Sequence, residues 1–169
     1  YGPYDSVNGR NDSETVPVRL SRGGKFALVY TIKGKDYINI NEKIHGPFLF
    51  ADPRSLSLSS AGDYSFCYLQ SKENLYVIIN NKKYGPFPGA GNLATGIFDD
   101  GKYFFEYTDK AGDFFINIGG KEYRHEDVEF PSGKPEKIFI FKKGDKWFVN
   151  NGDSLSGPFK EVTVLDADP

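Results

Sequence analysis

The sequence predicts an all-β protein, a β-propeller-like array of about four blades, each a four-stranded antiparallel sheet. Three observations lead to this prediction. Apolar residues alternate with period two in short runs, and no segment shows the periodicity of a confident helix. Glycine (19 residues) and proline (10 residues) fall between these runs, where turns require them. One pattern of strands and turns also occurs four times along the 169 residues, with about the length of a propeller blade.

Each copy of the repeat begins at a glycine, continues through two strands and ends at a Gly-Pro-Phe corner. The opening glycines are Gly24, Gly62, Gly101 and Gly133, and the corners begin at Gly46, Gly85, Arg124 and Gly157. The third corner has lost its Gly-Pro, and with Arg124 counted in its place the four spacings are 22, 23, 23 and 24 residues. This regularity indicates structural repeats.

The first strand of each copy is predicted to bury its aromatic residues on one face. The alternating residues are Phe26, Leu28 and Tyr30 in the first copy, Tyr64, Phe66 and Tyr68 in the second, and Tyr103, Phe105 and Tyr107 in the third. Because successive strand residues point to opposite faces, Val29, Cys67 and Glu106 are expected on the other face. The second strands, at 37–40, 76–79, 115–118 and 147–150, are expected to lie between two neighbours.

The remaining segments complete a single repeat domain, 1–169. Short polar loops at 32–36, 71–74, 109–113 and 142–146 are predicted to close hairpins. A further strand is expected ahead of the opening glycines, at 16–21, 55–59 and 93–98, which gives approximate units 16–48, 49–87, 88–124 and 125–160. In the fourth unit Gly133 follows Arg124 by only nine positions, so its innermost strand is expected to be shortened or replaced.

The two ends of the chain leave the closure of the array open. Residues 1–4 form a corner with no repeat before it, and 162–165 could start another inner strand. Either four blades close into a ring with a terminal segment covering an edge, or the chain is a fragment of a larger propeller, and we favour the ring. Because unpaired strand edges invite pairing, an unclosed array is expected to self-associate.

These turns and corners carry a resemblance to a known family. The run Phe98-Asp99-Asp100-Gly101-Lys102-Tyr103, followed by the strand at 115–118, resembles the bacterial WD40-like propeller repeats of the TolB type. The Gly-Pro-Phe corner after an Asn-containing turn at 79–87 is similar to the ending of an uncharacterised subset of them. The first two turns, at 21–24 and 60–62, depart from the usual Ser-Pro-Asp-Gly-Lys turn, and the only Trp is followed by Phe. The resemblance implies the propeller architecture and a periplasmic or cell-envelope location, and it transfers no site residue.

Composition excludes several classes of partner. The formal net charge of −2 offers no basic surface for nucleic acid or for an anionic membrane. No apolar run approaches the roughly 20 residues needed to span a bilayer, so no membrane insertion is expected. The single Cys67 cannot form an internal disulfide and is interpreted as a small buried strand residue.

Candidate functional residues lie where the repeat breaks its own pattern. The main candidate is the third corner, Tyr123, Arg124, His125, Glu126 and Asp127, as a binding site. The loops at 5–15 and 88–92 also interrupt the pattern. His45 occupies a column that is Tyr in the second and third copies, so it is expected to pack as a ring. No catalytic motif, metal site or cofactor motif is recognised.

Two function classes follow from these residues. The first is a non-catalytic binding or scaffold module that presents propeller loops to a protein or polymer partner. The second is a propeller-fold hydrolase that acts on a glycan with carboxylates from different blades, which rests on an analogy of fold. Carboxylates that converge in space would favour the hydrolase.

Overall fold

The described part of the chain is all-β apart from one short 3₁₀ turn. A computed structural model describes residues 18–88, 94–129, 139–151 and 154–163. Sheet 1 contains β1 (Val18–Leu20), β2 (Phe26–Ile32), β3 (Lys35–Ile40) and β4 (Lys43–Phe48). Sheet 2 contains β5 (Phe50–Ala51), β6 (Ser57–Leu58), β7 (Tyr64–Ser71), β8 (Asn74–Ile79) and β9 (Lys82–Pro88). Sheet 3 contains β10 (Thr95–Ile97), β11 (Tyr103–Thr108), β12 (Phe114–Ile118) and β13 (Lys121–His125). Sheet 4 contains β14 (Asp127–Glu129), β15 (Phe139–Lys143), β16 (Lys146–Asn150) and β17 (Leu155–Phe159).

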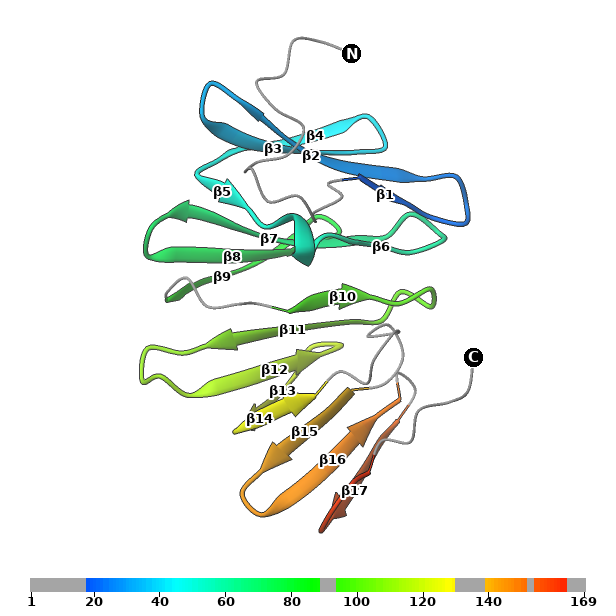
Figure 1. The fold of residues 1–169 in the computed structure, drawn as a ribbon, viewed down its shortest axis with the longest axis vertical. Helices are drawn as coiled ribbons and strands as arrows, with labels where there is room; N and C mark the ends of the chain where they lie inside the picture. Colours follow the sequence, from blue (N-terminus) through cyan, green and yellow to red (C-terminus); the bar gives the residue numbers. More distant parts are fainter. Residues whose placement is uncertain (1–17, 89–93, 130–138, 152–153, 164–169) are drawn as a thin grey trace.

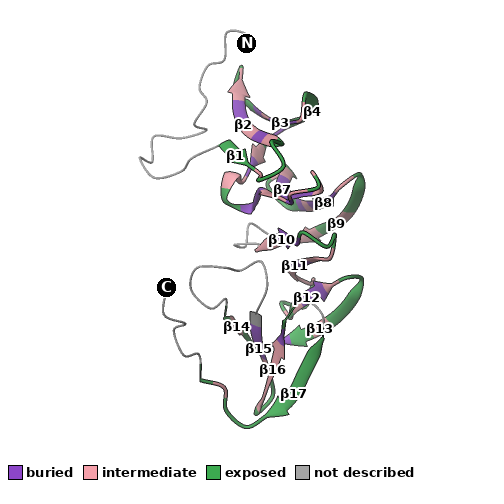
Figure 2. Ribbon diagram, turned by 90° about the vertical axis from the view of Figure 1, so that its right-hand side faces the viewer, coloured by how far each residue is buried: buried purple, intermediate pink, exposed green. Residues whose placement is uncertain are grey.

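All four sheets share one topology. Their strands are antiparallel and follow sequence order, with β5 and β6 both pairing with β7 in sheet 2. The described sheets span residues 18–48, 50–88, 95–125 and 127–159. The last strands β9, β13 and β17 are the more exposed side of the array (Figure 2).

The sheets stand one after another in an open row and do not close into a ring. Sheet 1 lies at one end of the molecule and sheet 4 at the other (Figure 1). The closed ring favoured from the sequence is therefore not found among the described sheets. Residues 1–4 and 164–165, which belong to the terminal segments on which the expectation of a ring was based, lie outside the described residues.

One aromatic pair recurs at the same place in every sheet. The pairs join the second strand to the third, and in each the rings are stacked: Tyr30–Tyr37, Tyr68–Tyr76, Tyr107–Phe115 and Phe141–Phe148. Their centroids are 5.3 to 5.5 Å apart and their planes are inclined by 12° to 21°. Cross-strand ring pairs of this kind stabilise a sheet and fix its register. The fourth pair also corrects the sequence alignment, because Phe148 and not Trp147 is the counterpart of Tyr37.

The opening glycines form one repeated turn. The residue three positions before each glycine donates its N–H to the carbonyl of the residue after the glycine, in Ser21–Lys25, Ser59–Asp63 and Phe98–Lys102, at 2.7 to 2.9 Å. Gly24, Gly62 and Gly101 have φ of +73°, +96° and +81°, a region that side-chain-bearing residues rarely adopt. The recurrence of these glycines in the sequence is therefore a backbone requirement of the turn.

The Gly-Pro corners insert one extra residue into the last strand of the sheet. In sheet 2, Val77 pairs with Tyr84 but Leu75 pairs with Phe87, and sheets 1 and 4 show the same shift of register. The Gly-Pro peptide is cis in all three corners. A Cβ on Gly85 would lie 2.7 Å from the carbonyl oxygen of Leu75, so the corner admits only glycine there. The extra residue is a β-bulge that turns the following phenylalanine toward the next sheet.

That phenylalanine joins neighbouring sheets. The Phe48 ring lies 4.1 Å from the Tyr68 ring of sheet 2, and the Phe87 ring lies 4.4 Å from the Tyr107 ring of sheet 3. Phe48 is 7% exposed, whereas Phe159, which occupies the same position at the end of the row, is 40% exposed. The hydrophobic core of the described residues is thus a series of layers between successive sheets.

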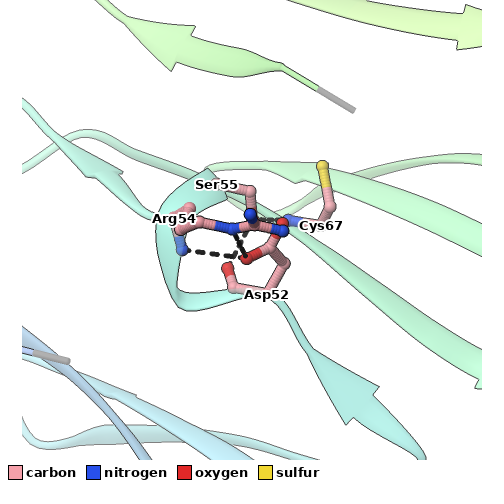
Figure 3. A network of polar contacts seen from close by, with 4 residues as sticks. All are labelled: Asp52, Arg54, Ser55 and Cys67. Atoms are coloured by element: carbon pink, nitrogen blue, oxygen red, sulfur yellow. Dashed lines mark hydrogen bonds and ion pairs between the residues drawn. The ribbon is translucent and has the colours of Figure 1, made fainter. Parts of the chain in front are cut away.

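The first strands of sheets 2 and 4 differ from expectation. In sheet 2 the strand is split by a 3₁₀ turn, η1 (Pro53–Ser55), at which Cys67 N–H donates to Ser55 Oγ at 2.8 Å instead of to a strand neighbour (Figure 3). In sheet 4, β14 is three residues long, as β1 and β10 are, so the expected shortening is wrong. The connection into sheet 4 is also a single residue, Glu126 between β13 and β14, as Leu49 is between β4 and β5.

Candidate functional site

The five candidate residues of the third corner do not converge on one point. Tyr123, Arg124 and His125 end β13, Glu126 is the linking residue, and Asp127 begins β14. In an unbulged strand, successive side chains alternate between faces. The structure therefore brings His125 together with a residue outside the predicted set and separates the remaining four.

Tyr123 and Arg124 point to opposite sides of sheet 3. The Tyr123 ring packs 5.6 Å from the ring of Phe141 in sheet 4. The Arg124 guanidinium donates from Nη2 to Asp113 Oδ1 at 2.6 Å, and the Arg124 side chain is largely exposed while that of Asp113 is half-buried. Arg124 therefore forms a surface ion pair within its own sheet, of the kind that contributes little to stability.

His125 occupies the position of the phenylalanine in the other corners. In β12–β13 the register is unbroken, with Ile116 opposite Tyr123 and Phe114 opposite His125. The single Arg124 thus stands where the other corners have Gly-Pro, and His125 stands where they have Phe. Its side chain is 5% exposed and faces sheet 4, as Phe48 and Phe87 face their following sheets.

Glu106 is the residue that meets His125. His125 Nε2 lies 3.6 Å from Glu106 Oε1, and the Glu106 side chain is 13% exposed. By register Glu106 lies opposite Ile116, the position that Val29 and Cys67 hold in sheets 1 and 2, where both are buried. Sheet 3 therefore carries two ionisable groups in columns that are otherwise apolar.

Burial dominates the electrostatics of this pair. It raises the pKa of Glu106 from 4.5 to about 7, against a smaller lowering by a backbone hydrogen bond with Ala94. It lowers the pKa of His125, against smaller opposing effects of the backbone at Asp127 and Phe115 and of the Asp127 charge. Within the described residues neither ring nitrogen of His125 makes a hydrogen bond of good geometry. Near neutral pH the pair is thus disposed toward its uncharged form.

Glu126 and Asp127 belong to sheet 4. Glu126 N–H donates to the Lys142 carbonyl at 2.8 Å, and its Oε1 accepts from Gly144 N–H at 3.2 Å. Asp127 accepts from Val128 N–H at 2.9 Å and lies opposite Lys142 in the β14–β15 ladder. The boundary between the two sheets therefore falls between His125 and Glu126.

His45 is a half-buried packed ring, and Cys67 is a core residue. His45 makes edge contacts with the rings of Tyr64 and Phe66, at 5.4 and 5.5 Å, which confirms its expected role as a packed ring. Burial lowers its pKa, with a smaller effect of the Lys43 charge. Cys67 is 2% exposed, and burial raises its pKa to about 12, as expected for a small buried strand residue.

The described residues contain few other chemical possibilities. No group of three or more His, Cys, Asp or Glu side chains in them could hold a metal ion. In that same part of the chain no helix is long and apolar enough to cross a membrane. The loop at 5–15 and most of the loop at 88–92 lie outside the described residues.

Sequence reasoning missed Glu106 for a specific reason. The alternation placed Glu106 on the same face as Val29 and Cys67, which the structure confirms. A comparison of that column across the repeats exposes the odd residue, a carboxylate among apolar side chains. Predicting that Glu106 meets His125 also requires knowing that the register of β13 is unbroken. The loss of Gly-Pro in the sequence suggests that register but does not establish it.

The paired groups have limited chemical scope. Glu106 and His125 can exchange a proton, but both side chains are buried between sheets. In comparisons with known proteins, no family model and no curated protein sequence matches this chain.

Proposed function

We propose that this chain is a non-catalytic binding or scaffold module of the propeller type, related to the WD40-like repeats, which presents loops to a protein or polymer partner. The observation that carries the proposal is a continuous row of turns along one edge of the sheets. We call it the turn row and define it as residues 21–25, 59–63 and 98–102.

Neighbouring turns of the row hold one another in place. Ser60 N–H of the second turn donates to Asp99 Oδ1 of the third at 2.7 Å. The first turn touches the second so closely that a Cβ on Gly23 would lie 2.2 Å from the Ser60 carbonyl oxygen. A row fixed in this way loses little conformational freedom on binding, which favours affinity.

The charge of the turn row changes along its length. The first turn exposes Arg22 and Lys25, and the third exposes Asp99 and Asp100, with Lys102 Nζ 3.1 Å from Asp100 Oδ2. A partner that lies along the row would meet basic groups at one end and acidic groups at the other. Complementary charges of this kind set the orientation and the association rate of a partner.

Binding to peptide libraries and polysaccharide arrays tests the proposal. We expect a saturable peptide or polysaccharide ligand whose affinity falls at least tenfold in the variant Arg22→Glu. The matched control is Lys110→Glu, which makes the same charge change at an exposed hairpin on the opposite edge, and it should change the affinity less than twofold. No saturable ligand, or equal losses in the two variants, would contradict the proposal.

The alternative, glycan hydrolysis, has one favourable observation. Glu106 has the raised pKa, about 7, that a general acid needs. Its carboxyl group, however, faces His125 between two sheets. Polysaccharides incubated with the protein should therefore show no new reducing ends, and release of reducing ends that disappears in Glu106→Gln would favour the hydrolase.

A further inference from the structure

Sheets 3 and 4 meet at a junction unlike the others in the row. At the first two junctions, between sheets 1 and 2 and between sheets 2 and 3, the corner contributes a phenylalanine, Phe48 or Phe87, against a tyrosine of the following sheet. At the third junction the corner contributes His125 from β13, and β11, two strands away in the same sheet, contributes Glu106. Both side chains lie in the layer that covers Phe141 of sheet 4.

We propose that this junction is a pH-responsive joint, in which ionisation of Glu106 against the unbonded ring of His125 loosens sheet 4 from sheet 3. The proposal concerns the junction itself and does not depend on the binding function proposed above. His125 ends sheet 3, and the single residue Glu126 leads directly into sheet 4, as Leu49 does between sheets 1 and 2.

An ionised Glu106 has no bonded cation in the described structure. Its distance of 3.6 Å from His125 Nε2 exceeds a hydrogen bond, and burial keeps the imidazole neutral. Arg124 points to the other face of β13 and is bound to Asp113. In the β14–β15 ladder the pair Val128–Phe141 faces sheet 3. The next pair along, Asp127–Lys142, therefore faces away from sheet 3.

Most of the other described side chains that face the pair are aromatic or aliphatic. From β12 they are Phe114 and Ile116, from β13 Tyr123, and from sheet 4 Val128, Phe141 and Phe148. The lysines on this face of sheet 4 are Lys143, which is exposed, and Lys146, which pairs with Asp145, and neither forms an ion pair with Glu106 in the described structure. The Asp127 charge acts on His125 by opposing the lowering of the imidazole pKa. A carboxylate buried among such groups is costly, and the cost is relieved when the joint opens and water reaches it.

The direction of the response follows from linkage. The pKa of Glu106 is raised from 4.5 to about 7 in the closed joint. The stability of the closed joint with a neutral Glu106 is therefore fully present below about pH 4.5 and is lost as the pH rises through about 7. With an ordinary value in the open joint, the ratio of open to closed forms rises roughly tenfold between pH 6.0 and pH 8.5.

Thiol labelling of a cysteine placed inside the joint measures this ratio. Val128→Cys is the reporter, because Val128 packs in the layer between sheets 3 and 4. Its labelling rate is divided by that of an exposed Lys160→Cys variant, which removes the effect of pH on thiol reactivity. The native Cys67, buried in sheet 2, reports opening of the rest of the molecule in the same samples.

We expect the corrected rate at position 128 to rise about tenfold from pH 6.0 to pH 8.5, and less than twofold when Glu106→Gln is present. Glu73→Gln, the same change at an exposed hairpin of sheet 2, is the matched control and should leave the tenfold rise intact. If Glu106→Gln fails to fold, Glu106→Val restores the residue that sheet 1 carries in this column and should also abolish the rise. An equal rise with and without Glu106, or labelling of Cys67 in parallel with position 128, would overturn the proposal.

Discussion

At the scale of single residues, the repeat explains most side chains and isolates the few that it does not. Glu106 stands in a column with Val29 and Cys67, and His125 stands in a column with Phe48 and Phe87. Each substitution replaces an apolar contact by an ionisable group that burial holds near its neutral form. Among the described residues, Glu106 and His125 are the only acidic and basic residues in contact with each other on the face of sheet 3 that meets sheet 4.

His45 provides a residue-scale prediction. It packs against Tyr64 and Phe66, and its buried Nε2 makes no hydrogen bond among the described residues. Because burial lowers its pKa below 6.5, the stability that the neutral ring supports is present above about pH 6.5 and is lost as the pH falls below that value and through the lowered pKa. His45→Phe should therefore raise the free energy of unfolding by about 1 kcal/mol at pH 8, and by more at pH 5. Urea denaturation at the two pH values measures the change, and a gain that is smaller at pH 5 than at pH 8 would contradict the assignment.

At the scale of elements, the unit of construction is a four-stranded sheet whose corner reaches the next sheet. The stacked ring pair fixes the second and third strands, and the bulged Gly-Pro corner turns a phenylalanine outward. Stability should therefore depend on where in the row a corner lies, because only a corner with a following sheet buries its ring.

The corner phenylalanines test this dependence. Phe48→Ala removes a ring that is 7% exposed and in contact with Tyr68, and should cost about 3 kcal/mol of unfolding free energy. Phe159→Ala makes the same chemical change at a ring that is 40% exposed, and should cost less than about 1 kcal/mol. Equal losses in urea denaturation would show that the last sheet is covered as fully as the first.

The 3₁₀ turn of sheet 2 gives a second prediction at this scale. Ser55 Oγ accepts from the buried Cys67 N–H and donates to the Asp52 carbonyl, so it replaces a strand partner where β5 and β6 are interrupted. Ser55→Ala leaves that N–H without an acceptor and should cost about 1–3 kcal/mol. Ser71→Ala, at a half-buried hairpin position, is the control and should cost less than about 0.5 kcal/mol. A loss at Ser55 no larger than at Ser71 would mean that water or another group replaces the serine.

At the scale of the whole molecule, the sequence predicted the sheets well and their assembly poorly. Turn glycines such as Gly62, alternating rings such as Phe66 and the Gly-Pro corners are local signals, because each is required by backbone geometry within one repeat. The open row, the split strand around Ser55 and the meeting of Glu106 with His125 depend on contacts between repeats. No local pattern in the sequence encodes those contacts. The sequence therefore led us to expect a closed ring, which the described sheets do not form.

The arrangement of the four sheets is tested most directly by distances between equivalent hairpins. Lys35, Glu73, Lys110 and Asp145 are exposed at or beside the hairpin between the second and third strands of sheets 1 to 4. Nitroxide labels on cysteines at these positions, with Cys67 protected by burial, give the distances from position 35 to each of the others by double electron–electron resonance. The open row predicts that the distance increases from 73 to 110 to 145. A distance from 35 to 145 as short as that from 35 to 73 would show a closed ring and contradict this account.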